Sequence, residues 1–135
     1  MGDLIAGRID YLCDSVSTSK PQIESRMVKA ITTTGSKRSA VLPDVPTARE
    51  QGLDFEVSTW QGLFLPKGVP EPIVRRLNEA LSSALDMPAV RTRFAEIGEE
   101  VAAPGRRSPE YFAEFVAREI ERWSGPIRES GASVD

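Results

Sequence analysis

The sequence predicts an α/β fold in which parallel strands alternate with flanking helices. Short runs rich in β-branched residues, such as Val28–Gly35, alternate with helical patterns in the first half of the chain. The second half places apolar residues at helical spacing, with proline near the expected helix starts. A chain of 135 residues with 40% hydrophobic content can bury a core, either as one domain or as part of a larger one.

The first elements are the end of a helix and a strand. Residues 4–6 are apolar and Gly7 suits the left-handed position that follows a helix, so we expect a helix to end there. Because an isolated turn of helix is marginal in stability, we expect further sequence upstream. Ile9–Cys13 predicts a short strand, in which Cys13 is buried as a small apolar side chain.

A short helix and two more strands come next. Ser17 or Thr18 is expected to cap the helix, with Pro21 near its first turn. Val28–Gly35 predicts one of the strands and Phe55–Leu65 the other.

The segment between these two strands, Lys37–Gly52, contains two prolines that exclude a helix interior. Pro46 and Thr47 can start a short helix that ends near Gly52.

Three helices are predicted in the second half. Residues 73–85 carry one apolar stripe at helical spacing. Pro88 starts the next helix and Gly98 stops it. Ser108 is the expected N-cap of the last helix, and we expect the pair Gly125–Pro126 to bend or end it.

Composition excludes several classes of function. A net charge of −3 disfavours a general nucleic-acid binder, which needs a basic face. The chain has one cysteine and no histidine, and we find no G-x-S-x-G, G-x-G-x-x-G or P-loop motif. An enzyme, a metal site and a cofactor are therefore not expected. No apolar run reaches the length of a membrane span, and no signal peptide is visible.

The rule that ligands bind beyond the carboxyl ends of parallel strands selects candidate binding residues. Asp14 follows the first strand, and Thr34 ends the second. Ser15, Ser17 and Thr18 can donate to a carboxylate, and the helix that follows offers backbone N–H groups to an anion. For Asp14 and the three hydroxyls, the alternative is local capping of the helix.

Three segments together resemble the solute-binding receptors of tripartite tricarboxylate transporters. They are "DLIAGRIDYLCDS", "KRSAVLPDVPTAREQG" and "STWQGLFLPKGVPEPIVRRLNEAL", in that order and spacing. The most specific part is "KRS-x-x-LPDVPT", followed by a correctly placed "W-x-GL-F-x-P-x-G-x-P". The resemblance runs from about Asp3 to the C-terminus and covers only the C-terminal half of such a receptor.

The resemblance implies part of a two-lobed, periplasmic-binding-protein-like fold of type II. Residues 1–57 would form the later part of lobe two, and residues 58–135 the crossing strand and the C-terminal helices of lobe one. It implies reversible capture of a small carboxylate or amino-acid-like solute by lobe closure, in the periplasm, without catalysis. Its partners would be the membrane permease subunits.

The resemblance also bears on individual residues. It places Asp14 near the ligand, where it could accept from a substrate amine or a bridging water. Thr59 and Trp60 would lie on the crossing segment, with Trp60 lining the pocket or packing in the core. Lys37 and Arg38 could clamp an anion, but a solvated surface pair is the expected arrangement.

In the two-lobed fold that the resemblance implies, the proline-rich segment has two interpretations. In the first, it is a stiff connector next to a hinge, which holds the short helix and fixes the register in which the crossing strand begins. Alternatively, it is an ordinary connection punctuated by proline.

The chain departs from the family pattern at several points. Arg26 and Met27 stand where relatives usually have a Gly-Lys turn. Val69 and Met87 replace the usual helix caps, which affects stability more than function. The N-terminal half, with the carboxylate-binding loop of lobe one, is missing. The alternative function is therefore a truncated half-receptor that does not bind solute and forms a structural or swapped oligomer, such as a homodimer.

Overall fold

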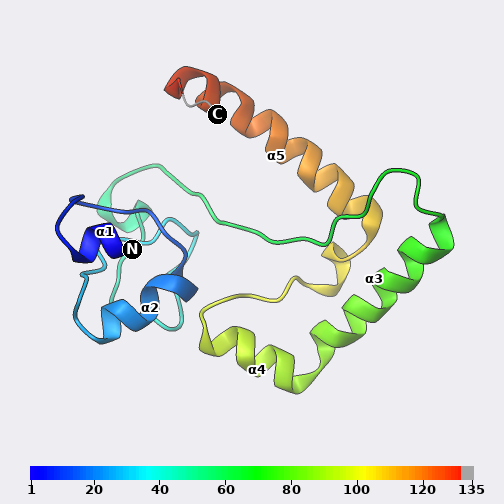
Figure 1. Cartoon of the computed structure of the whole chain (residues 1–135), viewed down its shortest axis with the longest axis horizontal. Helices are drawn as coiled ribbons and strands as arrows, with labels where there is room; N and C mark the ends of the chain where they lie inside the picture. The colour runs from blue at the N-terminus through cyan, green and yellow to red at the C-terminus, as the bar shows by residue number, and fades with distance from the viewer. Residues whose placement is uncertain (132–135) are drawn as a thin grey trace. The chain divides into compact units, whose positions relative to one another are not determined.

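The computed structural model describes residues 1–131 (Figure 1). Two units emerge from the contacts within the chain: one combines Met1–Phe64 with Met87–Val101, and the other combines Leu65–Asp86 with the chain from Ala102 onward. The division into lobes at residues 57 and 58 stays a prediction. The helical elements in chain order are α1 (Gly2–Ile5), α2 (Val16–Glu24), η1 (Arg49–Gln51), α3 (Glu71–Asp86), α4 (Pro88–Glu96), η2 (Pro104–Arg106) and α5 (Pro109–Ser130).

The helices of the second half follow their sequence signals closely. The hydroxyl of Ser108 accepts a hydrogen bond from the Tyr111 N–H at 3.1 Å, which confirms Ser108 as the N-cap of α5. Pro88 is the first residue of α4, and Met87 at its N-cap makes no side-chain capping bond. The expected cap is therefore missing there, as the sequence indicated.

Of the two outcomes expected at Gly125–Pro126, a bend or an end of the helix, the end does not occur. The helix continues through Pro126 to Ser130, and Gly131 then adopts the left-handed conformation with φ of 68°. Proline removes one hydrogen bond from the ladder. The loss of one ladder bond does not stop this helix, which runs for 22 residues and has Pro126 in its interior.

Helix α2 forms as predicted, but its cap differs. Ser15, and not Ser17 or Thr18, occupies the N-cap position. Pro21 lies inside the helix and not in its first turn. The helix ends where Arg26 adopts a left-handed φ of 60°, with its N–H donating to the Ile23 carbonyl at 3.0 Å. Arg26 is the one non-glycine residue of the described part with positive φ.

Paired strands are absent from residues 1–131. The segments Ile9–Cys13, Val28–Gly35 and Phe55–Leu65 are extended or irregular, and the one β-bridge is an isolated parallel pair between Thr33 and Thr47. Cys13 is exposed, so the expectation that it is buried in a strand is wrong. Strand pairing needs partners that are distant in sequence, and this chain supplies few of them.

Hydrogen bonds of one arginine, Arg107, hold together the unit that contains α3, η2 and α5. The Arg107 side chain is only 7% exposed and donates to the Ala102 carbonyl, the Ser82 carbonyl and Asp86 Oδ1, at 2.8, 3.3 and 2.9 Å respectively. Asn78 on α3 donates in turn to the Arg107 carbonyl at 2.6 Å. These bonds hold the segment before α5 against the last turns of α3.

Candidate functional site

The hydroxyl groups at the start of α2 form one hydrogen-bonded cluster. Ser15 Oγ lies 2.9 Å from Thr18 Oγ1 and 3.2 Å from Ser17 Oγ. Thr18 Oγ1 also lies 2.9 Å from the Ser15 carbonyl, to which it can donate. The structure therefore brings together three of the residues that the sequence selected.

This cluster leaves the backbone donors of the helix start without a side-chain acceptor. Ser15 occupies the N-cap position, but its hydroxyl makes no capping bond. The first N–H groups of a helix point outward along its axis, where the helix dipole adds partial positive charge. Hydroxyl and N–H donors in this arrangement suit a small anion such as a carboxylate.

Asp14 lies beside these donors and is exposed. Its Oδ1 accepts a hydrogen bond from the Ser15 N–H at 2.8 Å. This bond involves the N–H of the N-cap residue and not the first N–H groups of the helix, and ligand contact by Asp14 stays a prediction. A negative charge at this position opposes a bound anion but can accept from a ligand amine or hydroxyl.

The start of α2 is packed against the end of α4 and the proline-rich connector. A Cβ atom added to Gly98 would lie 2.9 Å from Val16 Cγ1 and 2.7 Å from Val41 Cγ2. Gly98 also has a φ of 79°, which disfavours any other residue. The predicted stop of α4 is thus confirmed, and it positions the first residue of α2.

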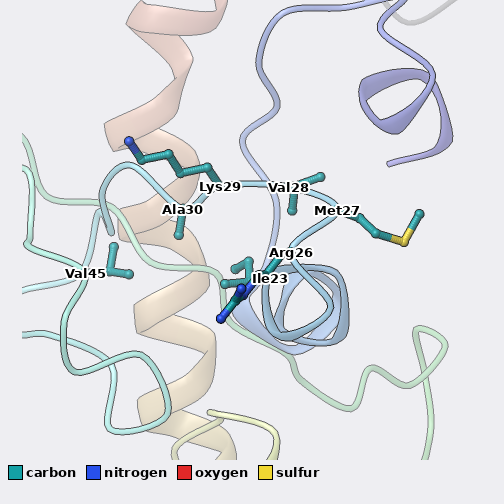
Figure 2. Close-up of a pocket in the computed structure, with 7 residues that line it drawn as sticks. All are labelled: Ile23, Arg26, Met27, Val28, Lys29, Ala30 and Val45. Atoms are coloured by element: carbon teal, nitrogen blue, oxygen red, sulfur yellow. The ribbon is translucent and has the colours of Figure 1, made fainter.

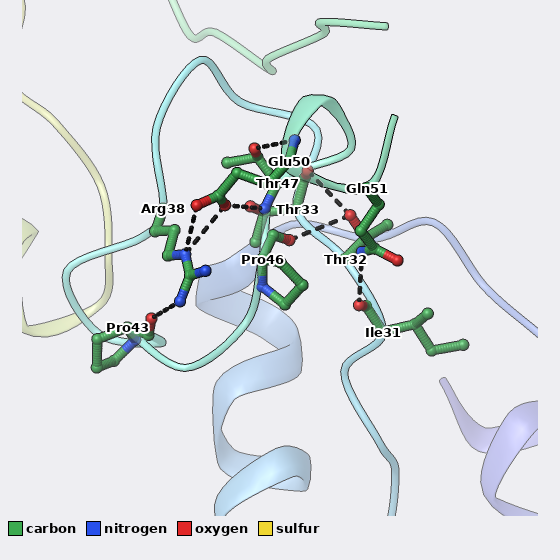
Figure 3. A network of polar contacts seen from close by, with 9 residues as sticks. All are labelled: Ile31, Thr32, Thr33, Arg38, Pro43, Pro46, Thr47, Glu50 and Gln51. Atoms are coloured by element: carbon green, nitrogen blue, oxygen red, sulfur yellow. Dashed lines mark hydrogen bonds and ion pairs between the residues drawn. The ribbon is translucent and has the colours of Figure 1, made fainter. Parts of the chain in front are cut away.

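The connector Lys37–Gly52 is fixed by a network of polar contacts (Figure 3). Arg38 Nε donates to both carboxylate oxygens of Glu50, each at 3.0 Å, and Arg38 Nη1 donates to the Pro43 carbonyl at 3.0 Å. Glu50 Oε2 accepts from the Thr47 N–H at 2.7 Å, while the Thr47 hydroxyl accepts from the Glu50 N–H at 3.2 Å. This reciprocal pair is a capping box at η1.

The network changes the acidity of Glu50. The hydrogen bond from Arg38 and the bond from the Thr47 N–H lower the pKa of Glu50 from 4.5 to about 2. Thr47 and the neighbouring Ala48 are 4% and 2% exposed, and they are the only buried residues among those described. The connector therefore contains the most buried point of the described chain.

The connector also holds the segment that ends at Thr34. The Pro46 carbonyl accepts from the Thr33 N–H at 2.9 Å, and the Thr33 carbonyl accepts from the Ala48 N–H at 2.8 Å. The Thr34 carbonyl accepts from the Val57 N–H at 2.8 Å. The connector is thus fixed to the segments before and after it, as the stiff-connector interpretation requires.

The remaining candidate residues lie on the segment after Val57. Thr59 is exposed, and Trp60 is 39% exposed with its ring centroid 6.5 Å from that of Phe64. Ligand contact by Thr34, Thr59 and Trp60 stays a prediction.

Sequence reasoning missed the roles of Arg38, Thr47 and Glu50. The signal was present, because Thr47-Ala48-Arg49-Glu50 matches the T-x-x-E pattern of a capping box. Lys37 behaves as an exposed surface cation and pairs with Glu100 at 2.8 Å. Arg38 is also exposed, as expected, but its side chain joins two parts of the connector through Glu50 and the Pro43 carbonyl.

A separate hollow of about 560 Å³ lies next to the left-handed turn after α2 (Figure 2). Its lining is mostly apolar, with two cationic side chains: Ile23, Arg26, Met27, Val28, Lys29, Ala30 and Val45.

Within residues 1–131 there is no group of three or more histidine, cysteine or acidic side chains arranged to bind a metal ion. The helices of that part are all too short or too polar to cross a bilayer.

Curated relatives match almost the whole chain. A UPF0065 protein from the TAR-I ttuE-ttuC' intergenic region of Agrobacterium vitis is 43% identical over 97% of this chain, which corresponds to 38% of the relative. Protein BugT of Bordetella pertussis is 34% identical over 98% of this chain and 40% of its own length. The chain thus spans about two fifths of the length of these relatives.

Solved structures agree with the sequence relatives. MatC from Rhodopseudomonas palustris with bound malate has a TM-score of 0.85 and 47% identity, over 90% of this chain and 42% of MatC. The periplasmic binding protein BugD has a TM-score of 0.87 and 35% identity, over 97% of this chain and 44% of BugD. An R. palustris protein solved with adipate has a TM-score of 0.84 and 30% identity, over 96% of this chain and 43% of that protein.

The chain therefore contains part of the periplasmic-binding-protein fold. The family model described as "Tripartite tricarboxylate transporter family receptor" matches residues 1–132. Together with its relatives, this match shows that the chain belongs to the receptor family of tripartite tricarboxylate transporters.

Proposed function

We propose that this chain supplies one wall of a periplasmic receptor that captures a small carboxylate for uptake. The observation that carries the proposal is the start of α2, where three hydroxyl groups form one cluster and the N-cap residue makes no side-chain capping bond. Such donors match the charge and size of a carboxylate group. The ligand is captured reversibly, and no bond is made or broken.

The relatives support the class of ligand. MatC was solved with malate and another R. palustris relative with adipate, both of which are dicarboxylates. A dicarboxylate can place one carboxylate at the start of α2 and present the other to the opposite wall. That wall belongs to the part of the receptor fold that this chain does not span.

The description of the family as a transporter receptor supports a role in transport. In this proposal the receptor delivers its solute to membrane permease subunits, which recognise its closed form. In this scheme the connector and the segment around Thr59 and Trp60 lie near the hinge. The Arg38–Glu50 network contributes by keeping the connector stiff while other residues absorb the change in dihedral angles.

A chimera tests the proposal. The part of MatC that matches this chain would be replaced by the chain itself, and binding of malate, adipate and a tricarboxylate would be measured by titration calorimetry. We expect binding of at least one acid. Thr18→Val, which removes one hydroxyl donor, should weaken binding about fivefold, corresponding to about 1 kcal/mol.

The control is Ser83→Ala, because the Ser83 hydroxyl donates only to the Glu79 carbonyl on exposed α3. It should leave the affinity unchanged. A chimera with native-like circular dichroism that binds none of the acids would contradict the proposal, and so would equal losses in the two variants.

A further inference from the structure

The hollow at the C-terminal end of α2 has an apolar floor and a charged rim. The lining residues that are half-buried are all apolar: Ile23, Val28, Ala30 and Val45. The lining residues that are exposed are Arg26, Met27 and Lys29. The volume of about 560 Å³ lies within the range of small-molecule sites, about 300–1,000 Å³. This arrangement suits a ligand with an apolar body and one polar end that stays near water.

The two cations at the rim have no acidic partner. Within residues 1–131, neither Arg26 nor Lys29 forms an ion pair, although they are only three residues apart. Figure 2 shows the Lys29 side chain extending on the side where Val45 lies. Two like charges this close repel each other, and an anion bound by both relieves that repulsion. The charge of the rim therefore selects an anionic group as the polar end of the ligand.

Hydrogen bonds hold both sides of the hollow in place. The N–H groups of Met27 and Val28 donate to the Gln22 carbonyl on α2, at 2.9 and 3.3 Å. Val45 belongs to the connector, which the network around Glu50 fixes. Because the floor is formed before any ligand arrives, binding requires little further ordering of the chain.

The backbone at the rim is strained. Arg26 has a φ of 60°, in the left-handed region that favours glycine. Non-glycine residues in this region are enriched at ligand-binding sites, where their side chains are held in a required position. The strain at Arg26 thus supports a binding role for this turn independently of its charge.

We propose that this hollow is a second binding site, for a monocarboxylate with an apolar chain, such as a medium-chain fatty acid. The apolar chain packs on the floor, and Arg26 and Lys29 bind the carboxylate at the rim. Malate fits this site poorly, because its second carboxylate and its hydroxyl would lose water against apolar side chains. The site lies at the opposite end of α2 from Ser15, so it does not depend on the function proposed above.

A titration of the isotope-labelled chain with octanoate, below its micellar concentration, tests this inference by backbone amide NMR. The amide signals of residues 26–30 and of Val45 should shift with one dissociation constant, and those of residues 16–18 should stay unmoved. Butyrate should bind at least about tenfold more weakly, because it buries fewer methylene groups. Octanol and malate should not shift the signals of residues 26–30.

Substitutions at the rim distinguish this site from general affinity for fatty acids. Lys29→Gln and Arg26→Gln should each weaken octanoate binding about threefold to fivefold, as expected for an exposed charge pair. Lys37→Gln is the control, because Lys37 is an exposed cation that pairs with Glu100 away from the hollow, and it should change the affinity less than twofold. If Arg26→Gln loses helical circular dichroism, the comparison of Lys29→Gln with Lys37→Gln decides alone.

Three results would overturn the inference. They are unmoved signals at residues 26–30 up to the highest octanoate concentration, equal binding of octanol and octanoate, and equal effects of the substitutions at Lys29 and Lys37.

Discussion

Arg38 and Glu50 are twelve residues apart, yet Arg38 Nε lies 3.0 Å from both carboxylate oxygens of Glu50. The same carboxylate closes the capping box with Thr47. One ion pair therefore joins the start of the connector to its short helix. Thr47 and the adjacent Ala48 are the buried residues of the described chain, so the pair lies next to its most buried point.

The lowered pKa of Glu50 predicts a specific acid sensitivity. The pKa falls from 4.5 to about 2 on folding, so the ionised carboxylate stabilises the fold above pH 4.5. That contribution is lost progressively as the pH falls from 4.5 toward 2. Glu50→Gln keeps an acceptor for the Thr47 N–H but loses the charge. Thermal melts should give Glu50→Gln a lower melting temperature than the parent chain at pH 7. Below pH 4.5, the melting temperature of the variant should fall less steeply with pH than that of the parent.

Arg38→Gln provides the partner variant for this prediction. If the two groups act as a pair, the double variant should be little less stable than either single one. Additive losses, or an acid profile of Glu50→Gln identical to that of the parent, would contradict the role given to this pair.

The left-handed turn at Arg26 predicts a gain from glycine. A non-glycine residue in the left-handed region costs about 1–2 kcal/mol, which glycine avoids. Because Arg26 has a φ of 60°, Arg26→Gly should raise the free energy of unfolding by about 1 kcal/mol in urea titrations. Arg26→Ala is the control, since it removes the charge but keeps the Cβ atom. A stabilisation by alanine equal to that by glycine would assign the effect to charge.

Alanine substitutions at three glycines distinguish the stability cost of backbone strain from the cost of steric contact. Gly98 has positive φ and no room for a Cβ, Gly7 has positive φ and open space, and Gly105 has open space without a positive φ. Alanine should therefore destabilise most at Gly98, by roughly 2–4 kcal/mol, less at Gly7, by about 1 kcal/mol, and least at Gly105. Urea unfolding of the three variants checks this order. Equal losses in the free energy of unfolding at Gly98 and Gly7 would show that the Val16 and Val41 side chains move to make room for the Cβ atom at little cost.

Asp14 should oppose a carboxylate ligand if its charge faces the bound anion. Asp14→Asn keeps the acceptor for the Ser15 N–H and removes the charge. At low salt, the affinity of the MatC chimera for malate should rise about threefold to fivefold, as expected from about 1 kcal/mol of repulsion near the surface. Asp44→Asn on the connector is the control and should have no effect. A fall in affinity would mean that Asp14 accepts a hydrogen bond from the ligand.

The helices could be predicted well from the sequence because their signals are local. Ser108, Pro88 and Gly98 each mark a helix boundary through interactions within one turn, and the structure confirms all three. Pro126 does not end α5, although proline is a strong local signal for the end of a helix.

The strands could not be predicted in the same way. Ile9–Cys13 and Val28–Gly35 have suitable composition, but a strand forms only when a distant segment pairs with it. The candidate site shows the same contrast. Ser15, Ser17 and Thr18 lie within one turn and could be selected from the sequence, whereas the contact between Arg38 and Glu50 depends on how the connector folds back.

The central claim is that the start of α2 receives a carboxylate. The most direct measurement is a titration of the isotope-labelled chain with malate, followed by backbone amide NMR. The account predicts that the amide signals of Val16, Ser17 and Thr18 shift together with one dissociation constant, and that the uncharged diester of malate has no effect. Unmoved signals at residues 16–18 up to saturating malate, or shifts confined to other parts of the chain, would contradict it.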